Sequence, residues 1–193
     1  MMKLSFDPFP ILSSERLEFR AMHVGDVHEV FAMRSDPDTM KFIPRPLAQN
    51  LDDALAHIKM VEDTIHNKQG INWAITLKNE TKMIGIAGFY RIKPESYRSE
   101  LGYMLLPEYR NQGYISEAIK TVLQYAFNQL DFNSIEAVID PDNFASERVL
   151  QKNGFIKEAH LRENELWEGK FLDTVIYSLL KRNFDPNKIC SLN

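Results

Sequence analysis

The stretch LLPEYRNQGYISEAIK, from Leu105 to Lys120, passes from the end of a strand through a short turn into the start of a helix. The turn is polar and flexible, and no Ser, Thr or Asp immediately precedes the helix to cap it. A helix start leaves up to four N–H groups without partners and carries roughly half a positive charge, so an anion there would satisfy both. Gly113 lets a ligand approach the backbone closely, and Arg110 adds a cation. The stretch therefore predicts an anion site, with a solvent-capped surface helix as the alternative.

The rest of the chain alternates between strand and helix patterns. Apolar residues recur with helical spacing after the turn, while short runs with strand character precede it. The pattern predicts strands at 15–20, 72–77, 83–92, 99–106, 134–139, 155–162 and 171–180, helices at 25–34, 51–67, 112–128 and 144–152, and a loop over 35–49. This order indicates one mixed α/β domain over residues 1–184, followed by a tail at 185–193.

The composition narrows the class of protein. The chain has 193 residues, of which 44% are hydrophobic and 26% charged, as in an ordinary globular domain. The net charge of −4, without a long run of Lys or Arg, argues against a nucleic-acid partner. The only cysteine, Cys190, lies in the tail, which excludes an intramolecular disulfide and a Cys-based zinc site. Without a long apolar run or a signal-peptide core, we expect a soluble cytoplasmic protein with no membrane partner.

Two familiar phosphate loops and a metal site are not predicted. The chain contains no GxxxxGK[ST], and Gly85 and Gly88 of GIAGFY do not form GxGxxG. These glycines fall inside a predicted strand, where they indicate a bulge or a close approach of two backbones. The five histidines lack metal-ligand spacing, so no metal is expected. The turn therefore belongs to another class of anion site.

Two stretches resemble the GCN5-related N-acetyltransferases. ELGYMLLPEYRNQGYISEA is similar to the acetyl-CoA signature of that family, in which a Q/R-x-x-G-x-G/A turn wraps the pyrophosphate. The turn here is Arg110-x-x-Gly113-x-Ile115, and Ile115 departs from the family's Gly or Ala. DPDNFASERVLQKNGF, from Asp140 to Phe155, resembles the N-x-x-S-x-x-x-x-x-K-x-G-F stretch of the ribosomal-protein-alanine N-acetyltransferase branch. The resemblance covers about residues 11–183.

The resemblance implies a fold and a cosubstrate. The fold would be α/β, a single mixed, mostly antiparallel sheet of about seven strands with flanking helices and a V-shaped opening between 99–106 and 134–140. Acetyl-CoA would place its pantetheine arm in the opening like an added strand. Asn143 would hydrogen-bond that arm, or cap the helix at 144–152, or do both. The expected cofactor-binding residues are Met104, Leu105, Leu106, Arg110, Asn111, Gln112, Gly113, Tyr114, Ile115 and Asn143.

Acetyl transfer needs a neutral amine and a stabilised thiolate. By resemblance to the same branch, Glu165 is the candidate base, and Glu100, on the strand before the turn, is the second candidate. A water relay or plain solvent deprotonation is the third option. Ser146 would hydrogen-bond the leaving sulfur, unless it only bonds local backbone at the start of its helix. A backbone N–H at a strand bulge near Met104 to Leu106 would steady the oxyanion.

These inferences predict an acetyl-CoA-dependent N-acetyltransferase that works by direct attack in a ternary complex. By resemblance, the acceptor is the N-terminal amine of a protein, with ribosomal proteins among the candidates. A small-molecule amine (polyamine, amino acid or drug) is the alternative acceptor, and a non-catalytic acyl-CoA sensor is the alternative function. Acceptor specificity is expected from segments 25–68 and 160–170, which carry no readable motif. The sequence leaves a homodimer open.

Overall fold

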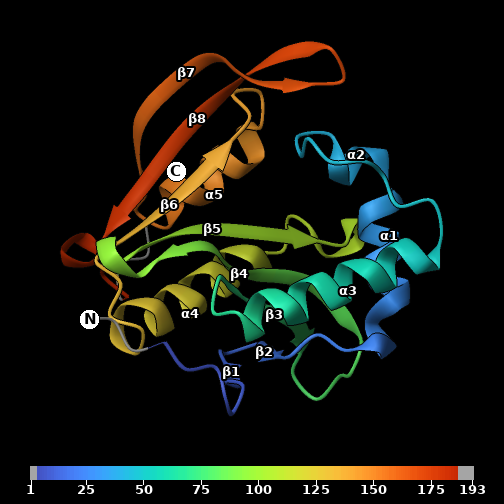
Figure 1. Ribbon diagram of the computed structural model, residues 1–193. Coiled ribbons are helices and arrows are strands. Elements are labelled where there is room, and N and C mark those ends of the chain that lie inside the picture. The colour runs from blue at the N-terminus through green and yellow to red at the C-terminus, as the bar shows by residue number, and fades with distance from the viewer. Residues whose placement is uncertain (1–3, 187–193) are drawn as a thin grey trace.

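The computed structural model describes residues 4–186 as one eight-stranded sheet flanked by helices (Figure 1). Its strand order is β1-β2-β3-β4-β5-β6-β8-β7. The strands are β1 (Leu12–Ser13), β2 (Leu17–Arg20), β3 (Ile71–Leu77), β4 (Met83–Lys93), β5 (Arg98–Leu105), β6 (Ser134–Ile139), β7 (Ile156–Trp167) and β8 (Lys170–Leu180). The helices are α1 (Val27–Ser35), α2 (Pro37–Met40), α3 (Leu51–His66), α4 (Tyr114–Asn128) and α5 (Phe144–Lys152). Cys190 and most of the predicted tail lie outside the described residues.

The sheet opens between the neighbouring strands β5 and β6. They form its parallel pair, and that pairing joins only Arg98–Glu100 to Ser134–Glu136. Beyond Glu100, β5 continues along β4 as far as Leu105, while β6 continues along β8 as far as Ile139. The two strands therefore diverge from a common point, and the implied mixed, mostly antiparallel sheet with a V-shaped opening is confirmed.

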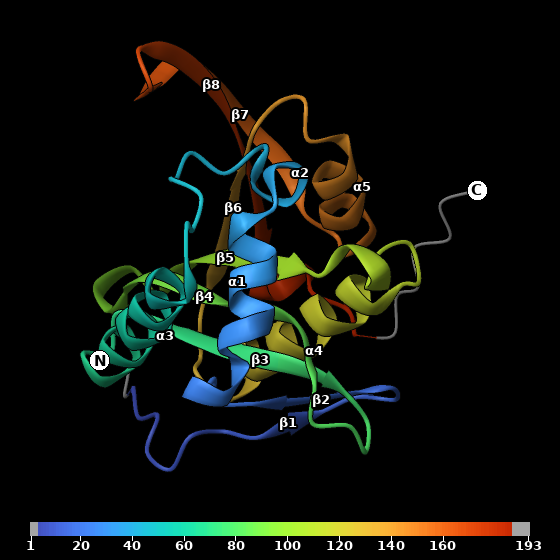
Figure 2. The same cartoon turned by 90° about the vertical axis from the view of Figure 1, so that its right-hand side faces the viewer.

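Helices cover both faces of the sheet, with α1 and α3 on one face and α4 on the other (Figure 2). The apolar stripe of α4, which includes Ala118, Ile119 and Val122, is fully buried against the sheet. Val30 of α1 and Ile58 of α3 pack in a second core on the opposite face. Among residues 4–186, no helix is long and apolar enough to cross a membrane.

The glycines of β4 allow close contacts with both neighbouring strands. A Cβ on Gly85 would lie 2.4 Å from the carbonyl oxygen of Met104, and one on Gly88 would lie 2.2 Å from that of Ile71. The predicted close backbone approach is therefore confirmed. The bulge expected near Met104 to Leu106 is wrong, since β4 and β5 pair regularly from Gly85–Leu105 to Tyr90–Glu100. Because Gly85 has no Cβ to displace the Met104 carbonyl, the regular ladder continues, and the irregularity falls at Tyr90–Lys93 instead.

The structure corrects two of the predicted elements and adds one strand that was not predicted. The predicted loop at 35–49 contains α2, because the side chain of Asp36 caps it and Pro37 occupies the first turn, where its missing N–H costs nothing. Strand β1 has two residues, too few for a periodic signal. Strand β7 runs five residues further than predicted, to Trp167, because pairing with β8 holds its polar end in place. The domain boundary at residue 184 stays a prediction.

Candidate active site

A cleft of about 1480 Å³ lies in the opening between β5 and β6 and reaches α1, α2 and α3. This exceeds the few hundred to 1,000 Å³ typical of a pocket for one small ligand, so the cleft has room for two substrates. Three groups line it: the α4 turn (Tyr109, Arg110, Asn111, Gly113, Tyr114, Ile115, Ser116), the two sides of the opening (Tyr103, Met104, Leu105, Asn143, Ser146), and the far end (Arg34, Arg45, His57, Asn72, Tyr90, Glu100).

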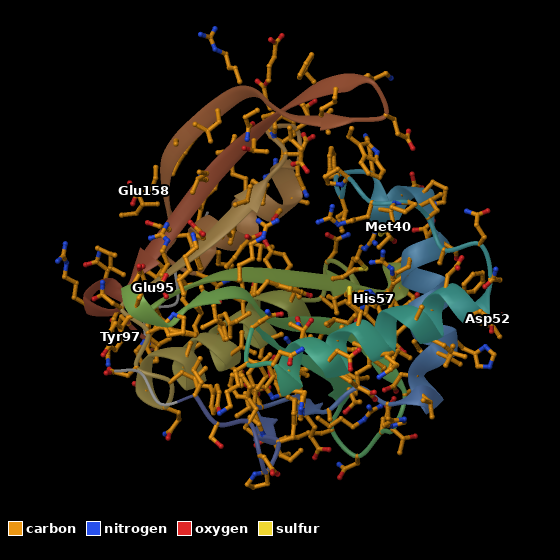
Figure 3. All side chains as sticks on the ribbon, in the orientation of Figure 1. Met40, Asp52, His57, Glu95, Tyr97 and Glu158 are labelled. Carbon is orange, nitrogen blue, oxygen red and sulfur yellow. The ribbon has the colours of Figure 1, made fainter. Side chains whose placement is uncertain are left out.

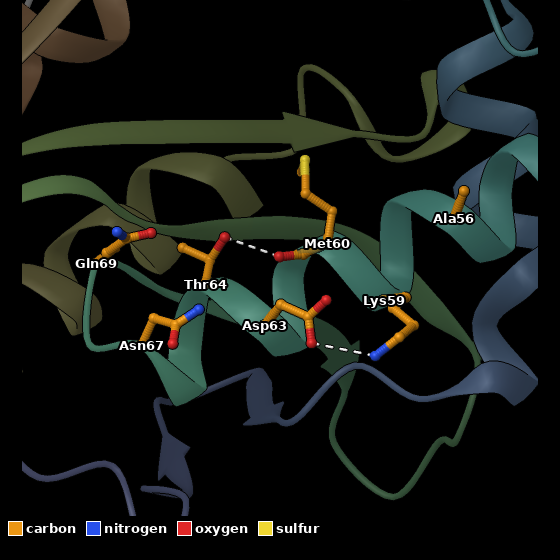
Figure 4. A pocket seen from close by; sticks show the side chains of 7 residues that line it. All are labelled: Ala56, Lys59, Met60, Asp63, Thr64, Asn67 and Gln69. Atoms are coloured by element: carbon orange, nitrogen blue, oxygen red, sulfur yellow. Dashed lines mark hydrogen bonds and ion pairs between the residues drawn. The ribbon is translucent and has the colours of Figure 1, made fainter.

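A second hollow of about 400 Å³ lies on the outer side of α3 (Figure 4). Four of its lining residues already interact with one another, since Lys59 pairs with Asp63 at 3.1 Å and the Thr64 hydroxyl donates to the Met60 carbonyl at 2.7 Å. Met60, Thr64 and Gln69 also line the cleft, so this hollow adjoins the rim. The hollow is much smaller than the cleft, and the cleft is the candidate site.

The turn before α4 has the geometry of an anion site. Gly113 is the N-cap residue, with φ of 81°, and no side chain caps the helix there. The helix's first backbone bond runs from Glu117 N–H to the Gly113 carbonyl, which leaves the N–H groups of Tyr114, Ile115 and Ser116 without helical acceptors. These three residues line the cleft. The predicted absence of a cap is confirmed, and the helix dipole points its positive end into the cleft.

Arg110 ties this turn to α2. Its guanidinium donates to the Thr39 hydroxyl at 2.6 Å and to the Leu105 carbonyl at 3.3 Å. Thr39 in turn hydrogen-bonds Asp36, and these bonds, aided by the charge of Arg110, hold the pKa of the Asp36 carboxyl below its usual value. Arg110 therefore lies beside the turn as expected, but its hydrogen bonds fix α2 to β5.

A second arginine, which no motif singled out, holds the turn from outside the cleft. Arg16 donates to the Gln112 carbonyl at 3.0 Å and pairs with Glu117 at 2.7 Å, and it lies 4.5 Å from the centre of the Tyr114 ring. Gln112 is not among the residues that line the cleft, and its side chain donates to the Glu108 carbonyl. Arg16 thus fixes the backbone of the turn while the turn's inner face remains open.

The strand edge beside the turn is free to receive an extended ligand. Within residues 4–186, β5 has no β6 partner beyond Glu100, and Met104 and Leu105 line the cleft at this edge. Leu106 is buried and donates its N–H to Ile84 on the β4 side, so the structure places it away from the cleft. An extended chain of alternating donors and acceptors could pair with this edge as an added strand.

Two hydroxyls meet across the opening. The Ser146 Oγ on α5 and the Tyr103 hydroxyl on β5 lie 2.5 Å apart. Burial raises the pKa of Tyr103 to about 12, so its phenol stays protonated near neutral pH. The side chain of Asn143 accepts from the Ser146 N–H at 3.1 Å, which makes it the cap of α5. Its side-chain N–H₂ is left for a ligand, and the pantetheine contact stays a prediction.

The structure brings one of the two candidate carboxylates into the cleft. Glu100 lines it, pairs with Arg91 at 2.8 Å and has a side chain that is 19% exposed. Burial raises the pKa of the Glu100 carboxyl above its usual value, against the opposing charge of Arg91. Glu165 lies on β7 opposite Leu172 and is not among the lining residues. The structure therefore groups Glu100, not Glu165, with Ser146.

The far end of the cleft contains residues that sequence analysis did not identify. Arg34, Arg45 and His57 come from the helical segment expected to determine specificity, whereas no residue of 160–170 lines the cleft. His57 lies on α3 beside the cleft (Figure 3), and burial, aided by the charge of Arg34, lowers its pKa to about 4. Among residues 4–186, no cluster of His, Cys, Asp or Glu side chains could hold a metal ion.

Known proteins resemble this chain in sequence and in fold. The family model described as Acetyltransferase (GNAT) domain matches residues 16–156, and the chain belongs to this family. The relative named Uncharacterized N-acetyltransferase YoaA, from Bacillus subtilis (strain 168), is 34% identical over 173 residues, which are 90% of this chain and 98% of that protein. The protein is therefore an N-acetyltransferase, as the resemblance predicted.

Two similar proteins are ribosomal-protein acetyltransferases. The ribosomal-protein-serine acetyltransferase of Escherichia coli (strain K12) is 29% identical over 99 residues, which are 51% of this chain and 55% of that protein. The solved structure of RimL, a ribosomal L7/L12 alpha-N-protein acetyltransferase in complex with coenzyme A, has a TM-score of 0.79 at 20% identity. The superposed region covers 89% of this chain and 98% of the RimL chain, so the two proteins share a fold.

Proposed function

We propose that this enzyme transfers the acetyl group of acetyl-CoA to an amine by direct attack within the cleft. The observation that carries the proposal is the divergence of β5 and β6. It leaves a free strand edge between an uncapped helix start and the hydroxyl pair of Tyr103 and Ser146. The helix start, the edge and the hydroxyls match the pyrophosphate, the pantetheine and the thioester in the order in which they follow one another in acetyl-CoA.

The cofactor end binds through backbone groups. The pyrophosphate would accept from the N–H groups of Tyr114, Ile115 and Ser116 and interact with the helix dipole. The pantetheine amides would pair with Met104 and Leu105, and the free N–H₂ of Asn143 would donate to the arm from the other side of the opening. Because main-chain groups do this work, the departure from the family turn at Ile115 leaves the donors in place.

The chemical step joins the amine nitrogen to the thioester carbonyl carbon and breaks the carbon–sulfur bond. The amine loses one proton, and Glu100 is the carboxylate positioned to accept it, directly or through water. The raised pKa of Glu100 makes it a better proton acceptor than an ordinary carboxylate. The base need not be strong, because an α-amine with a pKa near 8 is already partly neutral. Glu165 would act only if the β7–β8 hairpin moved toward the cleft.

The leaving thiolate is stabilised by a hydrogen bond and does not need a full proton transfer. Tyr103, with a pKa of about 12, is a weaker acid than a thiol near 8.5. Moving its proton to the sulfur would cost about 5 kcal/mol, whereas donating a hydrogen bond costs nothing comparable. In the linked pair of Tyr103 and Ser146, one hydroxyl therefore donates to the other and the second donates to the sulfur, while the thiolate takes its proton from solvent.

The acceptor proposed first is the N-terminal amine of a protein, with ribosomal proteins as candidates. The support comes from the names of the E. coli relative and of RimL. An amine of a small molecule is the second candidate, because the far end of the cleft presents charged side chains in a confined space.

The test measures release of free CoA thiol from acetyl-CoA with N-terminal peptides and small amines, together with calorimetric binding of acetyl-CoA. Turnover with any amine supports the proposal. Tight acetyl-CoA binding without turnover on any acceptor would instead identify a sensor domain. Tyr103→Phe should lower kcat with little change in acetyl-CoA affinity, and an unchanged rate would remove the hydroxyl pair from the mechanism.

A further inference from the structure

A buried amide faces the far end of the cleft without a partner. Asn72 of β3 is 0% exposed, and within the described chain neither its Nδ2 nor its Oδ1 has a hydrogen-bond partner. Asn72 is nevertheless one of the residues that line the cleft. An unpaired buried amide costs about 1–3 kcal/mol, so a residue of this kind points to a ligand that satisfies it.

The strand beside Asn72 is shaped around this amide. Gly88 is its partner on β4, and a Cβ there would lie 2.5 Å from the Asn72 Oδ1. Gly102 on β5 likewise makes room for Tyr90, because a Cβ added at Gly102 would lie 2.5 Å from the Tyr90 ring. Two glycines thus make room for two polar side chains that line the cleft. This is a formed site and not an incidental gap.

Two arginines at the same end of the cleft lack an anionic partner. Among residues 4–186, no carboxylate lies within 4.0 Å of the guanidinium nitrogens of Arg34 or Arg45. Burial lowers the pKa of Arg34, and the nearby charge of Arg45 lowers it further. The side chain of Arg45 hydrogen-bonds only the adjacent Pro44 carbonyl. Two neighbouring cations in a partly buried cleft repel each other unless an anion lies between them.

A carboxylate lies beside Tyr90, since Glu100 of β5 is its direct partner in the β4–β5 register. Burial raises the pKa of Tyr90 to about 12, and the charges of Arg34 and Glu100 act on it in opposite directions. Arg34, Tyr90 and Glu100 all line the cleft, and Glu100 pairs with Arg91 at 2.8 Å. A molecule with an amine at one end and an anion at the other would match this arrangement, with its amine toward Glu100 and the opening.

We propose that the acceptor amine also carries a carboxylate or phosphate group, which Arg34 and Arg45 bind while Asn72 hydrogen-bonds the chain that links it to the amine. This inference rests on the proposed acetyl transfer and specifies the class of acceptor. The amine loses one proton and gains the acetyl group, while the anionic group is unchanged. A free amino acid, an amino-alkyl phosphate and a peptide with an acidic residue near its N-terminus all share this chemistry.

The first experiment compares matched acceptors that differ only in the anion. The pairs are free L-amino acids against their amides, ethanolamine phosphate against ethanolamine, and short peptides with Asp against Asn at the second position. We expect kcat/KM to favour the anionic member by roughly tenfold or more in at least one pair, and the pair concerned identifies the source of the anion. Equal kcat/KM values in every pair would overturn the proposal.

The second experiment removes the cation. Arg34→Gln should abolish the preference for the anionic acceptor, because it lowers kcat/KM for the anionic member of a pair far more than for its neutral partner. Arg182→Gln, which removes the same charge from an exposed position outside the cleft, should keep the preference. A preference that survives in Arg34→Gln would contradict the assignment.

The third experiment separates the acceptor site from the proposed function. Calorimetry in the presence of CoA measures binding of the same acceptor pairs without catalysis. Binding that depends on the anion and on Arg34, in the absence of any turnover, would reject acetyl transfer and keep the anion site. Asn72→Leu should raise the thermal stability of the protein while it weakens acceptor binding, because it removes an unpaired amide that only the ligand satisfies. A loss of stability would show that Asn72 is purely structural.

Discussion

The two ends of the cleft are built in different ways. The cofactor end is local, since the last residues of β5, the turn and the first turn of α4 follow one another in the chain. The acceptor end is assembled from α1, the loop after α2, α3, β3, β4 and β5. We expect the first to bind its ligand through backbone geometry and the second through separate charged side chains. A backbone site is lost when its conformation changes, whereas a side-chain site can be altered one group at a time.

The largest effect is expected from the carboxylate at the junction of the two ends. Glu100→Gln should lower kcat by roughly 100-fold, the range for loss of a general base, with acetyl-CoA affinity little changed. Glu165→Gln, a matched change outside the cleft, should leave kcat within about twofold of the wild type. Steady-state CoA release checks both, and the reverse ranking would return the role of base to Glu165.

The difference between the two glutamates shows where sequence analysis ends. The resemblance favours Glu165 by its position in the chain, but that position does not fix where the β7–β8 hairpin points. The register of the hairpin shifts by two residues between Leu161 and Glu165, an irregularity that spacing along the chain does not predict. Glu100, by contrast, is next to the point where β5 and β6 part, and only the pairing of two distant strands reveals that point.

The next effect tests the backbone end with a pair of glycines in the same conformation. Gly113 has φ of 81° and Gly169, in the β7–β8 turn, has φ of 77°. Alanine at either position should cost roughly 1–2 kcal/mol of stability, because an L-residue is strained there. Only Gly113→Ala should also weaken acetyl-CoA binding, by roughly tenfold, as its Cβ approaches the Arg16 guanidinium at 3.3 Å and the turn shifts. Equal acetyl-CoA affinities, measured by calorimetry, would place the pyrophosphate elsewhere.

A comparable effect is expected from Arg110, whose hydrogen bonds hold α2 and not the turn's inner face. Arg110→Ala should weaken acetyl-CoA binding by about 1–3 kcal/mol if its charge acts on the pyrophosphate. Thr39→Val removes the contact between Arg110 and α2 and leaves that charge in place. If both variants bind acetyl-CoA with the same reduced affinity, Arg110 acts by positioning α2. If only Arg110→Ala is impaired, it acts directly on the anion.

The local end of the cleft was predictable and the assembled end was not. The missing cap before Tyr114 is visible in the sequence because a cap lies within a few residues of its helix. The 35–49 segment was predicted as loop from its prolines, although Asp36 and Pro37 together start a short helix. Asn72 looked like an ordinary strand residue, since no local pattern shows that its amide lacks a partner. Arg34 likewise gave no signal, because its unpaired charge is a property of the whole cleft.

The smallest effect concerns the acceptor end at acidic pH. Burial lowers the pKa of His57 to about 4, so this imidazole stays neutral in the folded protein at pH 5, while in the unfolded chain it binds a proton below about 6.5. The unfolded state therefore binds more protons between these values, and stability falls as the pH drops from about 6.5 to 4, by at most about 3 kcal/mol. His57→Gln should flatten this part of the profile in urea unfolding, whereas His66→Gln, an exposed change in the same helix, should not. A profile that keeps its slope in His57→Gln would assign the acid sensitivity to other groups. Because Arg34 helps to keep His57 neutral, Arg34→Gln should make the decline end at a higher pH and reduce its total size, which links this measurement to the acceptor site.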